Sequence, residues 1–280
     1  MRLANVKGRA ALLVGMTAID VEEATDGAFG PSLGSIYDRW DAFVVAAATI
    51  DTSRGRAFTE ADLDSPAPSP RQVFAIGLNY RSHAAETGMT PPEVPATFTK
   101  FPASLAGPFD EVELSGETVD WEVELVVVIG RLANKVPVES AWEYVAGLSV
   151  GQDISDRTLQ FAAGSQFSLG KSRRGYGPIG PWLVTTDEFD DPDNLELGCR
   201  LNGEVVQCAR TSDLIFSVPT LIATLSEILP LLPGDVIFTG TPAGVGIARQ
   251  PPRFLAPDDT LESWIEDIGT IRNTCRTAEH

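Results

Sequence analysis

Apolar and polar positions follow two different patterns along this chain, one before residue 65 and one after residue 70. Between residues 33 and 47 the apolar positions recur at intervals of three and four, which is the period of one helix face. These positions are Leu33, Ile36, Tyr37, Trp40, Phe43, Val44 and Ala47. The pattern predicts one helix in a small N-terminal unit, followed by a larger unit that is richer in strands.

Three short apolar runs predict buried strands in the larger unit. They cover residues 73–78, 121–129 and 235–238. Each run has the length of a strand and an apolar content that favours burial on both faces. The second run carries two glutamates at its beginning, which is an unusual place for charge in a buried strand.

A hairpin and a helix are predicted from local signals. Asn202-Gly203 suits positive φ, so we expect a hairpin between residues 197–201 and 204–208. Residues 219–229 have a helical pattern, with Ser217 as the capping residue before it and Pro230 after it.

Residues 65–70 divide the chain. Their sequence, Ser-Pro-Ala-Pro-Ser-Pro, cannot continue a helix or occupy a central strand, which is typical of a linker. We therefore expect a small N-terminal α+β domain over residues 1–65 and a catalytic domain over residues 71–280. Many strands and few long helices favour an α+β, mainly β, fold over a doubly wound parallel sheet.

The charge balance narrows the class of function. Of 280 residues, 39 are acidic and 21 are basic, which gives a formal net charge of −18. Nucleic acids and anionic membranes are bound through Lys and Arg, so we expect neither as a partner. Three scattered cysteines are typical of a reducing cytoplasm, and no apolar run reaches the roughly 20 residues of a membrane helix. A cytoplasmic enzyme with a small substrate is expected.

The two glutamates in the run at residues 121–129 are the strongest chemical signal. Because side chains alternate along a strand, Glu122 and Glu124 point to one face, together with Asp120. Like charges at the mouth of a buried strand repel each other unless a cation joins them. Asp153 ends another apolar stretch, and three carboxylates suit Mg²⁺ or Mn²⁺. The alternative to a metal site is that Glu122 and Glu124 lie on the solvent-exposed face of an antiparallel sheet. The sequence pattern alone does not show that Asp153 lies near the two glutamates.

His83 is the internal histidine of the two in this chain, the other being His280. If residues 79–86 form a helix, His83 and Glu86 are neighbours on one face. Glu86 can then orient the imidazole while His83 moves a proton or activates a water. The alternative is an ordinary pair on a solvated helix face.

Positive charge gathers in residues 170–176, which include Lys171, Arg173 and Arg174. Lys171 is a candidate to stabilise a substrate carboxylate or a developing enolate. Residues 240–246 lack the lysine of a nucleotide-binding loop. We interpret them as a turn whose amides and Thr241 hydroxyl bind a carboxylate.

Several blocks recur in an order that is specific to one family. They are IGLNY at 76–80, His83 with Glu86, FTKFP at 98–102, VDWEVE at 119–124, GQD at 151–153, LGKS at 169–172, LNGE at 201–204, PGDV at 233–236 and TGTPAGVG at 239–246. Together they resemble the fumarylacetoacetate hydrolase family over roughly residues 73–273. The resemblance implies a mixed β-sandwich roll as the catalytic domain and a homodimer.

The resemblance also implies roles for single residues. It implies a metal site and catalytic groups, namely the ligands Glu122, Glu124 and Asp153, the lid residues His83 and Glu86, and Lys171. It implies substrate-binding positions at Asn79, Tyr80, Lys100, Gln207 and Thr241. Arg173 and Arg174 depart from the family pattern, and they would favour a dicarboxylate if they face the site. Gln152 stands where asparagine is common.

The implied chemistry is a divalent-metal-dependent conversion of a small 2-oxo acid, or its enol, through an enolate. Isomerisation, decarboxylation and C–C hydrolysis share that intermediate. The expected activity is therefore most like that of 2-hydroxyhepta-2,4-diene-1,7-dioate isomerase or acylpyruvate hydrolase in catabolism. A non-catalytic metabolite-binding member of the same fold is the alternative.

Overall fold

The computed structural model describes residues 1–162 and 164–278, so His280 lies outside the described residues. One large sheet contains 12 strands of these residues. They are β1 (Arg2–Val6), β2 (Arg9–Val14), β3 (Thr17–Asp20), β4 (Arg56–Ala57), β5 (Leu63–Asp64), β6 (Val73–Gly77), β7 (Ala96–Thr99), β8 (Leu105–Ala106), β11 (Val123–Ile129), β12 (Val145–Gln152), β14 (Gly177–Val184) and β17 (Val236–Phe238). The main path runs β4-β3-β2-β1-β14-β12-β11-β17-β6-β7, with β5 paired to β1 and β8 paired to β14.

A second sheet packs on the large one and makes a sandwich. It holds five strands in the order β16-β15-β18-β19-β9. They are β9 (Val112–Leu114), β15 (Glu196–Leu201), β16 (Glu204–Arg210), β18 (Thr260–Ile265) and β19 (Gly269–Thr277). The sheets contact each other through β11 and β15, β12 and β18, and β14 and β19. The mainly β, α+β fold that the sequence predicts is confirmed.

The remaining elements are short. A two-stranded ribbon joins β10 (Val119–Asp120) to β13 (Ser155–Asp156). The α-helices are α1 (Val21–Ala24), α2 (Leu33–Tyr37), α3 (Trp40–Ala47), α4 (Arg81–Thr87), α5 (Arg157–Ala162) and α6 (Val218–Ile228). Helix α6 follows the cap Ser217 as predicted, and the hairpin β15–β16 turns at Asn202-Gly203 with φ of 52° and 85°.

The single helix predicted over residues 33–47 is wrong, because the structure has two helices there. Helix α2 ends at Tyr37, and Arg39 leaves the helical region with φ −129° and ψ 33° before α3 begins at Trp40. The break lets the side chains of Tyr37, Trp40 and Phe43 all reach the core, with ring centroids 5.7–5.8 Å apart. Periodicity therefore located the buried positions from Leu33 to Phe43, but it missed the turn between them and wrongly included Val44, which is 42% exposed.

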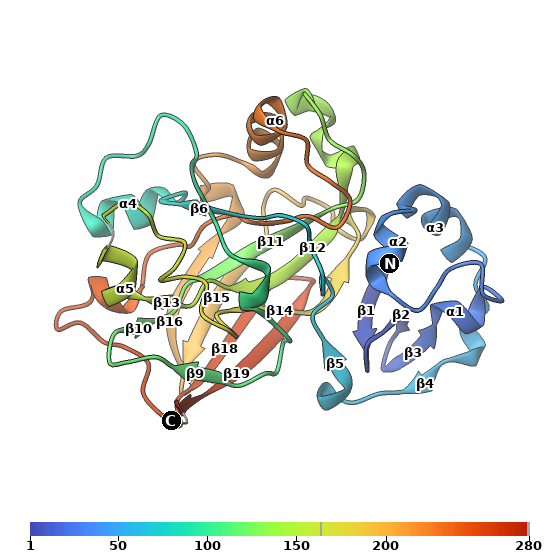
Figure 1. The fold of residues 1–280 in the computed structure, drawn as a ribbon, viewed down its shortest axis with the longest axis horizontal. Coiled ribbons are helices and arrows are strands. Elements are labelled where there is room, and N and C mark those ends of the chain that lie inside the picture. The colour runs from blue at the N-terminus through green and yellow to red at the C-terminus, as the bar shows by residue number, and fades with distance from the viewer. Residues whose placement is uncertain (163, 279–280) are drawn as a thin grey trace.

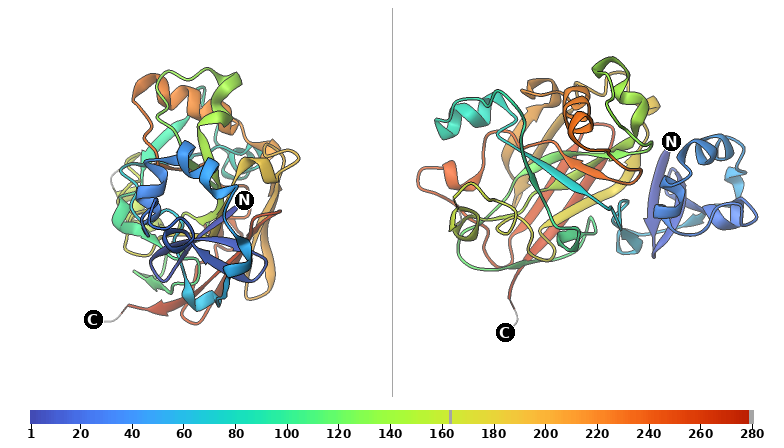
Figure 2. Two further views of the ribbon diagram at one scale, coloured as in Figure 1. Left: turned by 90° about the vertical axis from the view of Figure 1, so that its right-hand side faces the viewer. Right: turned by 45° about the horizontal axis from the view of Figure 1, so that its top comes forward.

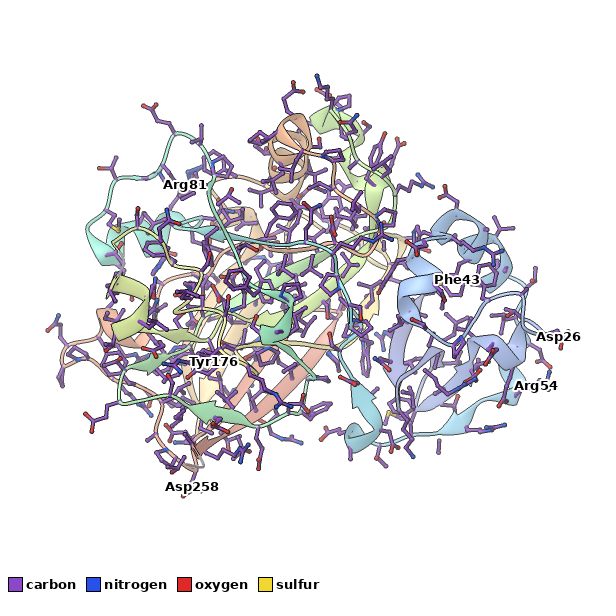
Figure 3. The ribbon with its side chains drawn as sticks, in the orientation of Figure 1. Asp26, Phe43, Arg54, Arg81, Tyr176 and Asp258 are labelled. Atoms are coloured by element: carbon purple, nitrogen blue, oxygen red, sulfur yellow. The ribbon has the colours of Figure 1, made fainter. Side chains whose placement is uncertain are left out.

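The N-terminal unit continues the large sheet. Strand β1 pairs antiparallel with β14, with Arg2 opposite Val184 and Leu3 opposite Leu183. Residues 65–70 form neither helix nor strand, and the Tyr37 hydroxyl donates to the Pro66 carbonyl (2.7 Å), so the proline segment packs against the N-terminal unit. Figure 1 shows this unit in blue beside the strands, and Figure 3 places Phe43 inside it and Tyr176 inside the larger unit.

Strand β11 is buried on both faces, as its composition predicts. Leu125 and Val127 belong to the hydrophobic core between the two sheets, whereas Val126 and Val128 belong to the core shared with the N-terminal unit. Helices α4 and α5 lie at the end of the sandwich that is remote from the N-terminal unit (Figures 1 and 2).

Candidate active site

Three carboxylates converge where β11 begins and β12 ends. Glu122 directly precedes β11, Glu124 lies within it, and Asp153 directly follows β12. The strands pair antiparallel, with Glu124 opposite Gly151, so the beginning of one meets the end of the other. One oxygen from each carboxylate lies within 4.8 Å of the others, and all three side chains are buried. The fold thus brings Asp153 to the two glutamates, which the sequence pattern could not show.

Two buried lysines contact this cluster. Lys171 Nζ donates to Glu122 Oε2 (2.7 Å), Asp153 Oδ2 (2.7 Å) and Ser155 Oγ (2.9 Å). Lys100 Nζ donates to Asp153 Oδ1 (2.6 Å) and to the backbone carbonyl of Lys171. Lys100 therefore holds both a carboxylate of the cluster and the backbone of the second lysine.

A buried arginine binds the other side of Glu122. Arg157, the first residue of α5, places NH1 2.7 Å from Glu122 Oε1 and Nε 2.8 Å from Asp120 Oδ2. The Asp120 carboxylate also accepts from the Gly246 and Ile247 N–H groups, at 2.7 and 3.0 Å. Asp120 thus anchors the arginine and stands apart from the three clustered carboxylates.

The two glutamates have opposite electrostatic surroundings. Burial raises the pKa of Glu124, and the charges of Asp153 and Glu122 raise that pKa further. Burial acts on Glu122 too, but Lys171 and Arg157 outweigh it and lower the pKa of Glu122 to about 2. Within the described residues, Glu124 has no lysine or arginine at ion-pair distance, and Gly240 N–H donates to it at 2.7 Å. An all-oxygen cluster with one uncompensated carboxylate fits a hard divalent cation such as Mg²⁺ or Mn²⁺.

Helix α4 brings the predicted dyad to the same place. His83 Nδ1 lies 3.1 Å from Glu86 Oε2, and Gly244 N–H donates to Glu86 Oε1 (2.8 Å). His83 is buried, and the loop whose Gly244 N–H binds Glu86 also binds Glu124 through the Gly240 N–H, so α4 and the carboxylate cluster share this loop. The helical spacing predicted for this pair is confirmed.

The five predicted substrate-binding side chains are all buried, and Lys100 among them bonds a carboxylate of the cluster. The Asn79 amide bonds the backbone of Phe216 and Thr239, and the Gln207 amide donates to Thr241 Oγ1 (2.9 Å) and the Pro242 carbonyl (2.8 Å). These two amides are thus engaged with protein groups. The Tyr80 hydroxyl is buried and has no hydrogen-bond partner within the part of the chain that the structure describes.

Arg173 and Arg174 do not join the cluster. Arg173 Nε bonds Asp156 Oδ2 (3.0 Å), and both arginines line a separate cavity of ≈ 1060 Å³ with Glu111 and Glu113. Their predicted effect on substrate charge therefore has no support in the geometry.

Sequence reasoning missed Asp120 as an anchor, and it missed Arg157 and Gln152 altogether as parts of the site. Asp120 had a signal, because it shares the alternation of Glu122 and Glu124, but its partner Arg157 lies 37 positions away. Gln152 stands where asparagine is common in the family, so the sequence offered no reason to assign it a role. Its amide oxygen accepts from Glu122 N–H (2.9 Å).

This chain is similar to known proteins in sequence and in fold. The profile described as fumarylacetoacetate (FAA) hydrolase C-terminal matches residues 72–276. Human oxaloacetate tautomerase FAHD2A, a mitochondrial protein, is 44% identical over 212 residues, which cover 75% of this chain and 68% of the human protein. A Mycobacterium smegmatis protein provisionally named HpcE is 53% identical, with a TM-score of 0.94 and 100% of both chains covered.

A third relative was crystallised with ligands. Maleylpyruvate hydrolase from Sphingobium sp. SYK-6, in complex with manganese(II) and pyruvate, is 26% identical over 100% of both chains, with a TM-score of 0.79. The profile match and the relatives above 40% identity together show that this chain belongs to the fumarylacetoacetate hydrolase family of enzymes.

Proposed function

We propose that this enzyme interconverts the keto and enol forms of a small 2-oxo dicarboxylic acid, such as oxaloacetate, with Mg²⁺ or Mn²⁺ as cofactor. The observation that carries the proposal is the convergence of Glu122, Glu124 and Asp153 within 4.8 Å, beside Lys171 and His83. The tautomerases at 42–44% identity support this substrate class.

The three carboxylates would hold the divalent ion. When bound, it supplies Lewis-acid polarisation of the 2-oxo group and lowers the free energy of negative charge on its oxygen. Lys171 places a second positive charge at the same carboxylates, and burial strengthens its interaction with an anionic substrate.

His83 is placed to move the proton. Its Nδ1 faces Glu86, which leaves Nε2 as the ring nitrogen for the substrate. Nε2 takes a proton from the carbon next to the 2-oxo group, and the C–H electron pair becomes the new C=C bond while the carbonyl π pair moves to oxygen. Return of the proton to that oxygen completes the enol. Glu86 stabilises the imidazolium that exists between these two transfers.

A C–C hydrolase is the second candidate. The support is the same His83–Glu86 pair, which can remove a proton from water, together with the maleylpyruvate hydrolase relative. Hydroxide would add to the distal carbonyl, and cleavage would release a carboxylic acid and a 2-oxo acid enolate. Decarboxylation reaches an equivalent enolate by loss of CO₂, so product analysis separates the three reactions.

The test is turnover of oxaloacetate, maleylpyruvate and acetylpyruvate with Mg²⁺ or Mn²⁺, and again with EDTA. Ultraviolet absorbance follows the enol, and chromatography detects pyruvate. We expect loss of the enol signal without pyruvate formation, abolished by EDTA. Glu124→Gln should lower the rate by about 100-fold or more, because outer-sphere changes already cost 10–100-fold. Glu227→Gln, an exposed carboxylate on α6, is the control. Equal rates with and without EDTA would contradict the proposal.

The setting of the enzyme is a further part of the proposal. We infer a cytoplasmic homodimer, and the three cysteines, which are all free, support a reducing compartment. Within the described residues, no helix is long and apolar enough to cross a membrane. Light scattering of the purified protein tests the dimer, and a mass of one chain, 30.0 kDa, would contradict it.

A further inference from the structure

The segment that carries Glu122 lacks regular strand pairing for its N–H groups. Strand β10 ends at Asp120 and β11 begins at Val123, so Trp121 and Glu122 lie between two strands. Three consecutive N–H groups here donate to side-chain oxygens. Trp121 N–H donates to Asp120 Oδ1 (2.8 Å), Glu122 N–H to Gln152 Oε1 (2.9 Å), and Val123 N–H to Gln207 Oε1 (3.0 Å). Side chains therefore hold the backbone in place at Glu122, the first of the clustered carboxylates.

Gln152 connects this segment to the second sheet. It is the last residue of β12, and its Nε2 donates to Ser263 Oγ (2.8 Å) on β18. Gln152 and Ser263 are both fully buried. The Glu122 carbonyl also accepts from Asp153 N–H (2.9 Å), so both backbone groups of Glu122 are bonded to the residues around the end of β12.

Gln207 holds the neighbouring residue from the other side. Its Oε1 accepts from Val123 N–H, while its Nε2 donates to Thr241 Oγ1 (2.9 Å) and the Pro242 carbonyl (2.8 Å). Thr241 Oγ1 in turn donates to the Val123 carbonyl (2.9 Å). The two side chains thus close a ring of hydrogen bonds around the backbone N–H and C=O of one residue, Val123.

The amide oxygen and the amide nitrogen of both glutamines bond to groups of the protein. A glutamine amide has one oxygen acceptor and two N–H donors, and it brings no net charge to a cluster that already holds three carboxylates. Buried amides that lose a partner are costly, so this network has one favourable arrangement. Mutation of a group that orients the ligands of a metal typically costs about 10–100-fold in metal affinity.

We propose that Gln152 and Gln207 are positioning residues, which fix the backbone at residues 122–123 and thereby aim Glu122 and Glu124 at the cation. Gln207 acts in this way and not as a substrate contact. This inference rests on the proposed function, because it requires a divalent ion at the three carboxylates.

The length of the Gln152 side chain matters for this positioning role. Asparagine is one methylene shorter, and it cannot reach both Glu122 N–H and Ser263 Oγ from the same backbone position. Gln152→Asn therefore keeps the amide chemistry and removes one of its two anchors. Ser263→Ala removes the far anchor and changes nothing that touches a clustered carboxylate.

The experiment is Mn²⁺ binding to the metal-free protein, followed by electron paramagnetic resonance. We expect Gln152→Asn and Gln207→Leu to raise the Kd for Mn²⁺ by about 10–100-fold and to alter the spectrum of bound Mn²⁺. Ser263→Ala should raise the Kd in the same direction. Ser149→Ala is the matched control, because this fully buried serine on β12 donates only to the Gly180 and Trp182 carbonyls. It should lower the thermal midpoint and leave the Kd unchanged.

The outcomes separate this inference from the proposed function. A wild-type Kd in both Gln152→Asn and Ser263→Ala overturns the role of Gln152, and neither change is large enough to prevent folding. A raised KM with an unchanged Mn²⁺ Kd in Gln207→Leu overturns the role of Gln207. Wild-type protein that binds no Mn²⁺ contradicts the proposed function itself.

Discussion

Glu86 accepts two hydrogen bonds that together set the direction of the His83 imidazole. One oxygen faces His83 Nδ1 at 3.1 Å, and the other accepts from Gly244 N–H at 2.8 Å. A carboxylate held at both oxygens has little freedom to rotate, so the ring it orients is also held. The second oxygen also ties α4 to the loop that follows β17.

The first prediction concerns His83. His83→Ala should lower turnover by about 10²–10⁴-fold, because a positioned acid–base group contributes that much. Binding of Mn²⁺ and of an oxalate-like inhibitor should persist, since the three carboxylates are unchanged. Steady-state kinetics and Mn²⁺ titration measure the two effects. Arg81→Ala, an exposed change at the start of the same helix (Figure 3), is the control, and full activity of His83→Ala would remove the imidazole from the mechanism.

For single residues, the sequence predicts which side chains carry the chemistry better than it predicts which distant side chains they bond to. Glu122 and Glu124 could be paired on one face, because alternation along a strand is a local property. Arg157 could not be assigned to them, because an arginine after a short strand looks the same on a surface or in a core. Its bond to Glu122 depends on α5 folding against β10, which involves contacts between distant residues.

For single elements, local sequence patterns predict some turns and helix boundaries and miss others. The apolar spacing across α2 and α3 is compatible with one helix, but the backbone leaves the helical region between Tyr37 and Trp40. In contrast, the hairpin at Asn202-Gly203 was predictable, since two residues with positive φ determine it. Residues 240–246 lie between these cases. Their glycines indicated a turn, but not that it contacts Glu124 and Glu86.

Gly244 tests the importance of that turn. Its φ is +106°, and a Cβ placed there would lie 2.1 Å from the Val206 carbonyl oxygen. Gly244→Ala should therefore destabilise the protein by about 1–3 kcal/mol and weaken the bond to Glu86, so kcat should fall as well. Gly116→Ala, whose Cβ would meet nothing within 4 Å, should change the stability by less than about 0.5 kcal/mol. Urea denaturation compares the two, and equal stability would show that the turn can rearrange.

The N-terminal unit is joined to the rest of the molecule through the large sheet, although the proline segment predicts two separate domains. Leu3 and Leu12 share a hydrophobic core with Val126 and Phe238. Two units that share a strand ladder and a core are expected to unfold together. The division into domains at residues 1–65 and 71–280 stays a prediction. Calorimetry tests whether the two domains unfold separately.

The prediction at this scale is a single unfolding transition. Leu3→Ala removes a fully buried side chain from β1 and should cost about 2–5 kcal/mol, with the whole transition moving to lower temperature. Met16→Ala, at a side chain that is 69% exposed, should leave the transition nearly unchanged. Differential scanning calorimetry distinguishes the cases. Two resolved transitions, with only one sensitive to Leu3→Ala, would show that the N-terminal unit unfolds independently.

The pairing of β1 with β14 has a consequence during protein synthesis. Arg2 and Leu3 are synthesised about 180 residues before their partners Val184 and Leu183. At roughly 5–20 residues per second, the nascent chain waits on the order of ten to forty seconds for that strand. During this interval the free edge of β1 can pair with another chain. Strand β1 is thus made early and completes its pairing late.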